Sequence, residues 1–211
     1  MAATDPGAQA FWDARFGNSE CLVFGEAPNL FLSQQAHLLP PGSDVLAVAD
    51  GEGRNGVWLA EQGHRVTATD ISPVGQAKAR ALAAKRGVTL DFVIADLDEW
   101  DWPEADYDAV VAIFIQFFGP DARARMFQGM KRAVRPGGLI LLQGYRNEQL
   151  SYGTGGPGAV ENLYTEALLR ELFADWQIEH LAVHDSALAE GPAHNGMSAL
   201  IDLVARRPAN G

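Results

Sequence analysis

Short apolar runs alternate with longer segments of helical pattern along most of the chain. Strands separated by segments of helix length are typical of successive βαβ units. We therefore predict an α/β fold with helices on both faces of a seven-stranded, mostly parallel sheet. The predicted strands lie near residues 44–49, 65–69, 90–95, 108–114, 138–144, 177–185 and 197–206.

Capping residues mark the ends of the predicted helices. Ser72 and Pro73 fit the N-cap and the first position of a helix, and Gly87 fits the left-handed residue that ends it. A second helix is predicted to begin at Pro120 and to stop at Pro136–Gly138. The remaining helices are predicted over residues 11–16, over residues 30–39 and in the stretch that ends at Gly63.

The last two strands are separated by a loop alone, "ALAEGPAHNGM", which has no helical pattern. Because parallel strands need a longer crossover, these strands should form an antiparallel hairpin at one edge of the sheet. The length of 211 residues suits a single domain, residues 1–211. We divide it into an N-terminal segment, residues 1–40, and an α/β core, residues 41–211.

Composition narrows the possible partners. The formal net charge of −11 disfavours nucleic acid, because a phosphate-backbone binder needs a basic surface. One cysteine, Cys21, argues against a disulfide framework. The start "MAATDPGAQA" lacks the pattern of a signal peptide, and the longest apolar run is too short to cross a bilayer. We predict a cytoplasmic protein without membrane, nucleic-acid or metal partners.

A glycine-rich turn follows the first predicted strand in "VLAVADGEGRNGVWLA", residues 45–60. Gly51, Gly53 and Gly56 have the G-x-G-x-x-G spacing that lets backbone N–H groups approach a ligand at a helix N-terminus. Asp70 ends the next strand, where a carboxylate can accept both hydroxyls of an adenosine ribose. The alternative is a tight turn beside a solvated aspartate. Nicotinamide dehydrogenases and S-adenosylmethionine methyltransferases share this arrangement.

A third signal separates these two families. Ala95, Asp96 and Leu97 end the third strand, where the Asp96 carboxylate and a main-chain N–H could read an adenine. With this "ADL", the "RPGG" turn before the fifth strand and the closing hairpin, the chain resembles the class I S-adenosylmethionine-dependent methyltransferases. The resemblance implies a Rossmann-like three-layer sandwich and S-adenosyl-L-methionine as cofactor. It places the cofactor against Ala49, Asp50, Gly51, Gly53, Arg54, Asn55, Asp70, Ile71, Asp96, Leu97, Ile113 and Phe117.

The first strand departs from the family pattern. Ala47 stands where an acid is usual, and Ala49 stands where a first glycine is common. The ammonium of the cofactor must then be held by other groups. The carbonyls of Ala49 or Gly51 could accept from it, and Asp50 either adds charge there or faces solvent.

Ligands of an open parallel sheet gather beyond the carboxyl ends of its strands, so three loops are candidates for holding the acceptor. Gln116 follows the fourth strand and is expected close to the sulfonium. Arg146 follows the fifth strand and either clamps an anionic acceptor or lies on the surface without a partner. His194, in the hairpin loop, either transfers a proton near neutral pH or is structural. These three are the predicted catalytic residues.

Weaker candidates surround them. The aromatic side chains near the fourth and fifth strands either pack in the core or touch substrate, and Glu190 is a minor candidate. His180 and His184 are expected to be packing or edge residues. The aromatic candidates are Phe114, Phe117, Phe118, Tyr145, Tyr152 and Tyr164.

The N-terminal stretch "FWDARFGNSECLVFGEAPNLFL" resembles the lid segment of the tellurite-resistance and thiopurine-type small-molecule methyltransferases. Trp12, Arg15 and Phe16 would close over the site if this segment is a lid, and the alternative is an amphipathic helix docked on the body. We predict methyl transfer to a small-molecule acceptor. A nicotinamide-dependent oxidoreductase and a non-catalytic cofactor-binding protein of the same fold remain the rivals.

Overall fold

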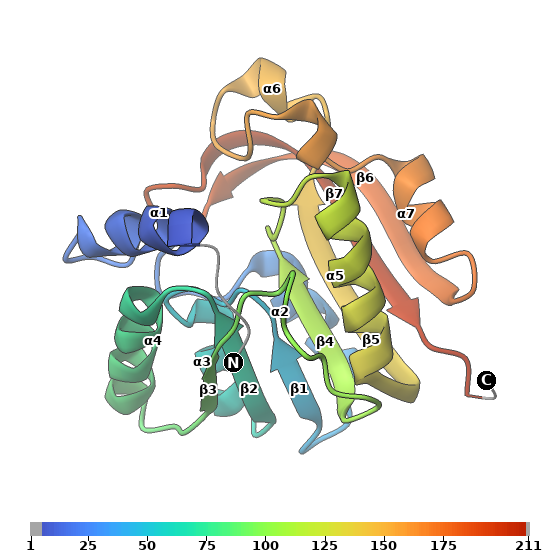
Figure 1. Cartoon of the computed structure of the whole chain (residues 1–211), viewed down its shortest axis with the longest axis horizontal. Coiled ribbons are helices and arrows are strands. Elements are labelled where there is room, and N and C mark those ends of the chain that lie inside the picture. The colour runs from blue at the N-terminus through green and yellow to red at the C-terminus, as the bar shows by residue number, and fades with distance from the viewer. Residues whose placement is uncertain (1–5, 210–211) are drawn as a thin grey trace. The chain divides into compact units, whose positions relative to one another are not determined.

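A computed structural model of the chain describes residues 6–209 (Figure 1). Its seven strands form one sheet in the order β3-β2-β1-β4-β5-β7-β6, and helices flank the strands. The described chain divides into two compact units. The first holds the residues up to Asp101 together with Glu190–Ala193, and the second holds Trp102–Ala189 and the residues from His194 onward. The predicted α/β fold with a mostly parallel sheet is confirmed.

Three parallel strands form the sheet of the first unit: β1 (Asp44–Ala47), β2 (Arg65–Asp70) and β3 (Asp91–Ile94). Helix α3 (Arg54–Glu61) follows β1, and helix α4 (Pro73–Arg86) follows β2. Because the strands are parallel, their carboxyl ends and the starts of both helices meet at one edge of this sheet.

Helix α4 begins and ends where the sequence predicts. The hydroxyl of Ser72 accepts a hydrogen bond from the Gly75 N–H at 3.0 Å, and Pro73 is the first helical residue. Gly87 ends the helix in the left-handed conformation, at φ 70°. These local signals act within one helical turn, so no distant contact is needed to set the boundaries.

The N-terminal segment contains helix α1 (Pro6–Gly17) and helix α2 (Leu30–Gln35), and α2 continues into the short 3-10 helix η1 (Ala36–Leu38). The predicted helix over residues 11–16 is thus confirmed and extends further, whereas the helix predicted over 30–39 changes type after Gln35. Helix α1 packs on α4 (Figure 1). Residues 1–5 of the predicted lid lie outside the described residues.

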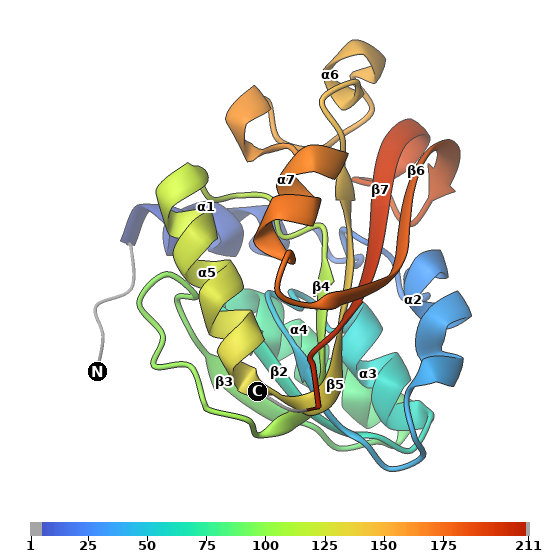
Figure 2. The same cartoon turned by 90° about the vertical axis from the view of Figure 1, so that its right-hand side faces the viewer.

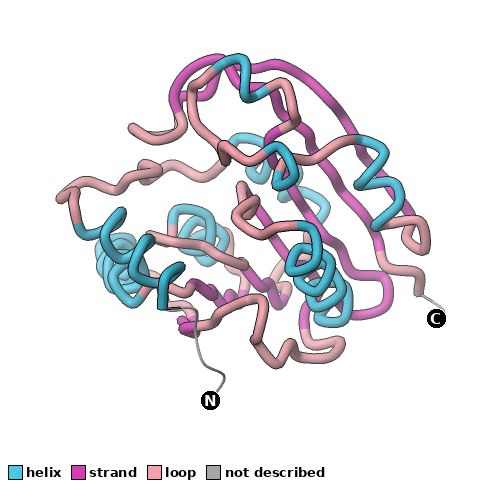
Figure 3. Tube along the Cα trace, turned by 45° about the horizontal axis from the view of Figure 1, so that its top comes forward, coloured by secondary structure: helices cyan, strands magenta, loops and turns pink. Residues whose placement is uncertain are grey.

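The second unit contains β4 (Tyr107–Ile113), β5 (Val134–Tyr145), β6 (Gln177–Ala189) and β7 (Asn195–Arg206). Strand β4 is parallel to β5, and β7 runs antiparallel between β5 and β6. The predicted terminal hairpin is confirmed. Its two strands run alongside each other for longer than predicted, so only residues 190–194 connect them (Figure 3).

Helix α5 (Pro120–Ala133) and helix α7 (Glu166–Leu172) cover the same face of the sheet of the second unit (Figures 1 and 2). Helix α6 (Gln149–Tyr152) and the 3-10 helix η2 (Val160–Asn162) lie in the loop after β5.

The prediction that Pro136–Gly138 separate α5 from a strand starting at residue 138 is wrong. Strand β5 begins at Val134 and runs through the "RPGG" turn, and α5 ends one residue earlier. The main chain of Gly137 and Gly138 is paired with Arg207, at 3.0 and 2.9 Å. Within residues 6–209, no helix is both long and apolar enough to span a membrane.

Candidate functional site

The glycine loop connects β1 to α3 in the first unit and is pinned to β2. The N–H of Asp50 donates to the carbonyl of Thr69 at 2.9 Å, and the N–H of Gly53 donates to the carbonyl of Asp50 at 3.0 Å. Gly51 adopts φ 58° and Gly53 φ 89°. A Cβ on Gly53 would lie 2.7 Å from the Cβ of Ala79. Glycine at this position therefore permits the close packing of the loop on α4.

Ala49 explains why glycine is common in this place in the family pattern. Its φ is 49°, in the left-handed region where an L-residue with a side chain is strained. The chain thus keeps the loop geometry without the usual glycine.

Asp70 closes the loop from the end of β2. One carboxylate oxygen accepts from the Gly51 N–H at 2.8 Å, and the other accepts from the Ser72 N–H at 2.8 Å. The side chain is buried, and burial raises the pKa of Asp70 to about 6 against the opposing effect of backbone hydrogen bonds from Ser72, Gly51 and Ile71. An ionised carboxylate has about four acceptor positions, so the three backbone donors leave room for a further donor.

Asp50 does not simply face solvent. Both oxygens of its half-buried carboxylate lie within hydrogen-bonding distance of the Gly56 N–H, at 3.1 and 3.2 Å, so the side chain covers the first turn of α3. Burial raises the pKa of Asp50 to about 7, and the neighbouring Asp70 contributes to the increase. The site therefore contains two carboxyl groups whose charged forms are poorly compensated.

The end of β3 lies beside Asp70. The N–H of Ala95 donates to the carbonyl of Asp70 at 3.0 Å, which aligns the "ADL" stretch with the end of β2. Asp96 and Leu97 are buried, and one oxygen of Asp96 accepts from the Asp98 N–H at 3.1 Å. The structure thus brings together Ala49, Asp50, Gly51, Gly53, Asp70, Ile71, Asp96 and Leu97 at the carboxyl edge of three adjacent strands.

Helix α1 touches this edge through Phe16. A Cβ on Gly51 would lie 3.2 Å from the Phe16 ring, and one on Gly75 would lie 2.8 Å from it. Asp13 accepts from the Ser72 hydroxyl, which fixes the same helix to the start of α4. Phe16 is buried and Trp12 stacks on it, whereas Arg15 is exposed. Helix α1 is docked on α4 next to the glycine loop. This position is compatible both with a lid over the site and with a helix that only packs there.

Arg54 and Asn55 have partners other than the predicted cofactor. Arg54 is buried and forms an ion pair with Glu190 at 2.8 Å. The side-chain oxygen of Asn55 accepts from the main-chain N–H of Asn29 at 2.9 Å. In the structure these two side chains therefore position the N-terminal segment and the hairpin tip.

Glu52 escaped the sequence prediction. Its buried carboxylate accepts from the Val23 N–H at 2.6 Å and pairs with Lys78 at 2.9 Å. A buried acid between two glycines of the loop was the available signal, because an unpaired buried carboxylate is costly and needs a partner.

Three predicted residues of the second unit lie close together. The Phe114 ring is 4.7 Å from the Tyr145 ring and 4.4 Å from the His194 ring, measured between centroids. Tyr145 and His194 are buried. Phe114 has φ 56°, and a bulky residue in this conformation is a strained feature of the kind found at functional sites.

Gln116 holds the main chain of Tyr145, a member of this aromatic cluster. Its amide nitrogen donates to the carbonyls of Tyr145, at 2.8 Å, and Asn162, at 3.2 Å. Its amide oxygen accepts from the Tyr145 N–H. The side chain is buried, and both of its polar ends bind the main chain, which indicates a positioning role.

Arg146 has partners, so the reading of an unpaired surface arginine is wrong. Its guanidinium pairs with Asp185 and with Glu148 and donates to the Leu200 carbonyl at 3.0 Å. Tyr152 donates its hydroxyl to the same Asp185 at 2.9 Å. A clamp on an anionic acceptor would compete with these carboxylates.

The other predicted residues of the second unit lie at various depths. Ile113 is buried at the end of β4, and Phe117 stacks obliquely on Phe118 with ring centroids 4.8 Å apart. Tyr164 is buried in the core. His184, predicted as a packing or edge residue, contacts Asp202 at 2.9 Å.

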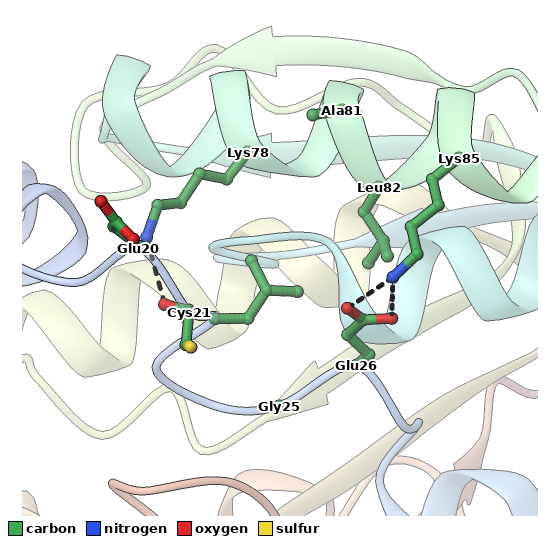
Figure 4. A pocket seen from close by; sticks show the side chains of 9 residues that line it. Glu20, Cys21, Gly25, Glu26, Lys78, Ala81, Leu82 and Lys85 are labelled. Carbon is green, nitrogen blue, oxygen red and sulfur yellow. Dashed lines mark hydrogen bonds and ion pairs between the residues drawn. The ribbon is translucent and has the colours of Figure 1, made fainter.

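A hollow of about 480 Å³ opens between α4 and the residues that follow α1 (Figure 4). Lys78 and Lys85 border it, and Lys85 pairs with Glu26 at 2.8 Å across its rim. None of the predicted site residues lines this hollow. Across the described residues, no group of three His, Cys, Asp or Glu side chains could hold a metal ion.

Comparison with known proteins agrees with this geometry. The family described as "Methyltransferase domain" matches residues 45–138. A 2-heptyl-1-hydroxyquinolin-4(1H)-one methyltransferase of Mycobacteroides abscessus is 25% identical over 142 residues, which are 66% of this chain and 61% of that relative. Uncharacterized proteins of Mycobacterium tuberculosis are 33% identical over 100 residues, and the chain spans 36% of the length of these curated relatives.

Two solved structures show the same fold. One, described as "Conversion of a Disulfide Bond into a Thioacetal Group during Echinomycin Biosynthesis", has a TM-score of 0.76 at 23% identity and covers 96% of this chain and 94% of its own. TehB from Haemophilus influenzae has a TM-score of 0.70 at 18% identity and covers 93% of this chain and 67% of its own. The architecture is therefore the Rossmann-like fold of class I methyltransferases. Residues 45–138 match the methyltransferase-domain family, and the shared fold agrees with that match.

Proposed function

We propose that this protein transfers the methyl group of S-adenosyl-L-methionine to a small-molecule acceptor. The position of the Asp50 carboxylate carries the proposal. A dinucleotide would place its pyrophosphate at the N-terminus of α3, where backbone N–H groups attract anions. There the Asp50 carboxylate already accepts from the Gly56 N–H. In its ionised form this carboxylate repels a pyrophosphate and attracts the cationic methionine portion of an adenosyl sulfonium.

The residues of the first unit fit this cofactor. The Asp70 carboxylate can accept from the ribose hydroxyls, and Asp96 follows the adjacent strand β3, where it can accept from the adenine amino group. Ala47 stands where the family usually has an acid that binds the ammonium group of the cofactor. Here Asp50 and the carbonyls of Ala49 and Gly51 would bind that ammonium group instead.

The acceptor would be held by the second unit. Phe114, Tyr145 and His194 offer apolar ring faces beside an imidazole, a combination suited to a small planar or apolar molecule. The substrate named for the M. abscessus relative is a small heteroaromatic molecule, and this supports the same class here. Gln116 holds the Tyr145 main chain, and Arg146 remains a candidate for an anionic group of the acceptor.

S-adenosyl-L-methionine, held by Asp50, Asp70 and Asp96, would supply an electrophilic methyl group and a neutral thioether as the leaving group. Holding the two reactants in line and excluding water would contribute roughly 7–11 kcal/mol relative to free reactants. A hydroxyl acceptor loses its proton to a ring nitrogen of His194. A thiolate needs no base. The cytoplasmic location and the lack of a nucleic-acid partner remain predictions from composition.

The test is a turnover assay with S-adenosylmethionine and a panel of acceptors. The panel contains 2-heptyl-1-hydroxyquinolin-4(1H)-one and an aromatic thiol, and mass spectrometry detects S-adenosylhomocysteine and the methylated product. We expect product with at least one acceptor and none with Asp70→Ala. Tight binding of S-adenosylhomocysteine without turnover of any acceptor would instead favour the non-catalytic rival.

A further inference from the structure

Side chains of the glycine loop bind the segment of chain that connects α1 to α2. We define the strap as residues 18–29, between α1 and α2, and the hairpin tip as residues 190–193; both belong to the first unit. We propose that cofactor binding to the loop and docking of the strap are coupled, with Glu52 and Glu190 as positioning residues. This inference rests on the proposed function.

Most of the contacts that attach the strap are polar, and the half-buried Leu22 packs against a buried apolar cluster. None of its apolar side chains is fully buried, and a hollow separates part of it from α4 (Figure 4). Segments with few buried apolar contacts open more easily than the elements around them. The strap can therefore detach without unfolding of the sheet.

Glu52 makes the first attachment. Its carboxylate accepts from the Val23 N–H and pairs with Lys78, and Lys78 also donates to the carbonyls of Ser19, at 2.6 Å, and Cys21, at 3.3 Å. Lys78 and its bond to Cys21 are visible in Figure 4. One loop residue thus fixes the first half of the strap.

Glu190 makes the second attachment at the other end. Its carboxylate accepts from the Asn29 side-chain nitrogen at 3.1 Å and from the Leu30 N–H at 3.1 Å, and it pairs with Arg54 at 2.8 Å. Asn55 adds its bond to the Asn29 main chain. The residues that follow the loop glycines therefore hold the end of the strap and the hairpin tip together.

The strap and the hairpin tip meet backbone to backbone. A Cβ on Gly191 would overlap the main chain of Phe24 and Gly25. The N–H of Ala193 donates to the carbonyl of Val23 at 3.2 Å. Contact this close is possible only while residue 191 lacks a side chain.

The coupling follows from shared residues. The N–H of Gly51 bonds Asp70 in the proposed cofactor site, while Glu52, the next residue, bonds the strap. A ligand that orders residues 51–55 also orders the side chains in this range that bind the strap. In the other direction, a docked strap holds the loop in the conformation that binds the ligand. Such coupling is reciprocal and typically changes an affinity by roughly 5- to 150-fold.

The experiment compares alanine variants at two glycines that have the same φ. Gly191 and Gly63 both have φ 88°, but a Cβ on Gly63 meets nothing within 4 Å. We expect Gly191→Ala to weaken S-adenosylhomocysteine binding about tenfold relative to Gly63→Ala, in titration calorimetry on the full chain. Both alanines meet the same unfavourable positive φ, so the control accounts for that cost and the difference reports on the contact with the strap. Equal affinities would overturn the inference.

A second pair of variants tests the charged attachment. Glu52→Gln removes the buried charge, and Glu26→Gln removes the exposed partner of Lys85 on the same strap. Hydrogen exchange of residues 19–30 should slow when S-adenosylhomocysteine binds to the wild type and to Glu26→Gln, and should change less in Glu52→Gln. Tight binding with unchanged exchange in the wild type would overturn the coupling alone. No binding to the wild type would overturn the proposed function, and the coupling with it.

Discussion

The N–H of Gly51 donates a hydrogen bond to Asp70 Oδ2 at 2.8 Å, and so a backbone without a side chain lies directly against the buried carboxylate. If this carboxylate binds the ribose, Asp70→Ala should weaken S-adenosylhomocysteine binding by about 2–3 kcal/mol, since hydrogen bonds to charged groups contribute about 1.5–3 kcal/mol. Titration calorimetry measures the loss. Asp91→Asn, an exposed acid on the adjacent β3, is the control and should bind normally.

The affinity for the cationic cofactor should depend on pH. Protonation of Asp50, with its pKa near 7, and of Asp70, with its pKa near 6, removes the charges that would attract it. Affinity should therefore rise as pH increases from 5.5 to 8, by at most about tenfold per pH unit for each proton released. Asp50→Asn should flatten the upper part of this rise. A pH-independent affinity in the wild type would remove both carboxyl groups from the site.

The same groups give the ligand-free protein an opposite trend in stability. Both pKa values are raised from an ordinary value of 3.8, so between pH 4 and 7 the folded state binds more protons than the unfolded state. The contribution of these groups to the free energy of unfolding therefore falls as pH rises through this range. Urea unfolding at several pH values should show a smaller fall for Asp50→Asn than for the wild type.

The left-handed Ala49 should be a site of stored strain. Ala49→Gly relieves a strain of about 1–2 kcal/mol and adds a chain-entropy cost of about 0.5–1 kcal/mol, so it should raise the free energy of unfolding slightly. Ala47→Gly, in β1 two residues earlier, should lower it because no strain is relieved. A loss of stability in Ala49→Gly comparable to that of Ala47→Gly would show that residue 49 is not strained.

His194 should matter only for acceptors that must lose a proton. His194→Gln is expected to slow methylation of a hydroxyl acceptor by 10²- to 10⁴-fold and to change the pH profile of kcat/KM. The rate with an aromatic thiol at high pH should change little. His37→Gln, an exposed histidine, is the control. Equal losses with both acceptors would assign His194 a packing role beside Phe114 and Tyr145.

Features set by neighbours in sequence were predictable. The caps of α4 at Ser72 and Gly87 act within one helical turn. The spacing of the loop glycines locates the proposed cofactor site at the end of β1. The hairpin of β6 and β7 followed from the lack of a helix between them. Each of these signals depends on residues only a few positions apart.

Contacts between distant residues were not predictable in this way. Asn29 and Glu190 lie 161 positions apart, so no local pattern shows the hydrogen bond between them. The ion pair of the buried Arg54 with Glu190 also joins residues far apart in the sequence. The extension of β5 through Pro136 depends on pairing with Arg207 at the other end of the chain. The partners of Gln116 and Arg146 likewise required the tertiary structure.

The central claim is that the glycine loop, Asp70 and Asp96, at the carboxyl ends of β1, β2 and β3, hold an adenosyl sulfonium cofactor. Titration calorimetry of the wild-type chain with S-adenosylhomocysteine and, separately, with NADH tests it most directly. We predict saturable one-to-one binding of S-adenosylhomocysteine and no measurable heat with NADH. Binding of NADH in the absence of S-adenosylhomocysteine binding would contradict the account.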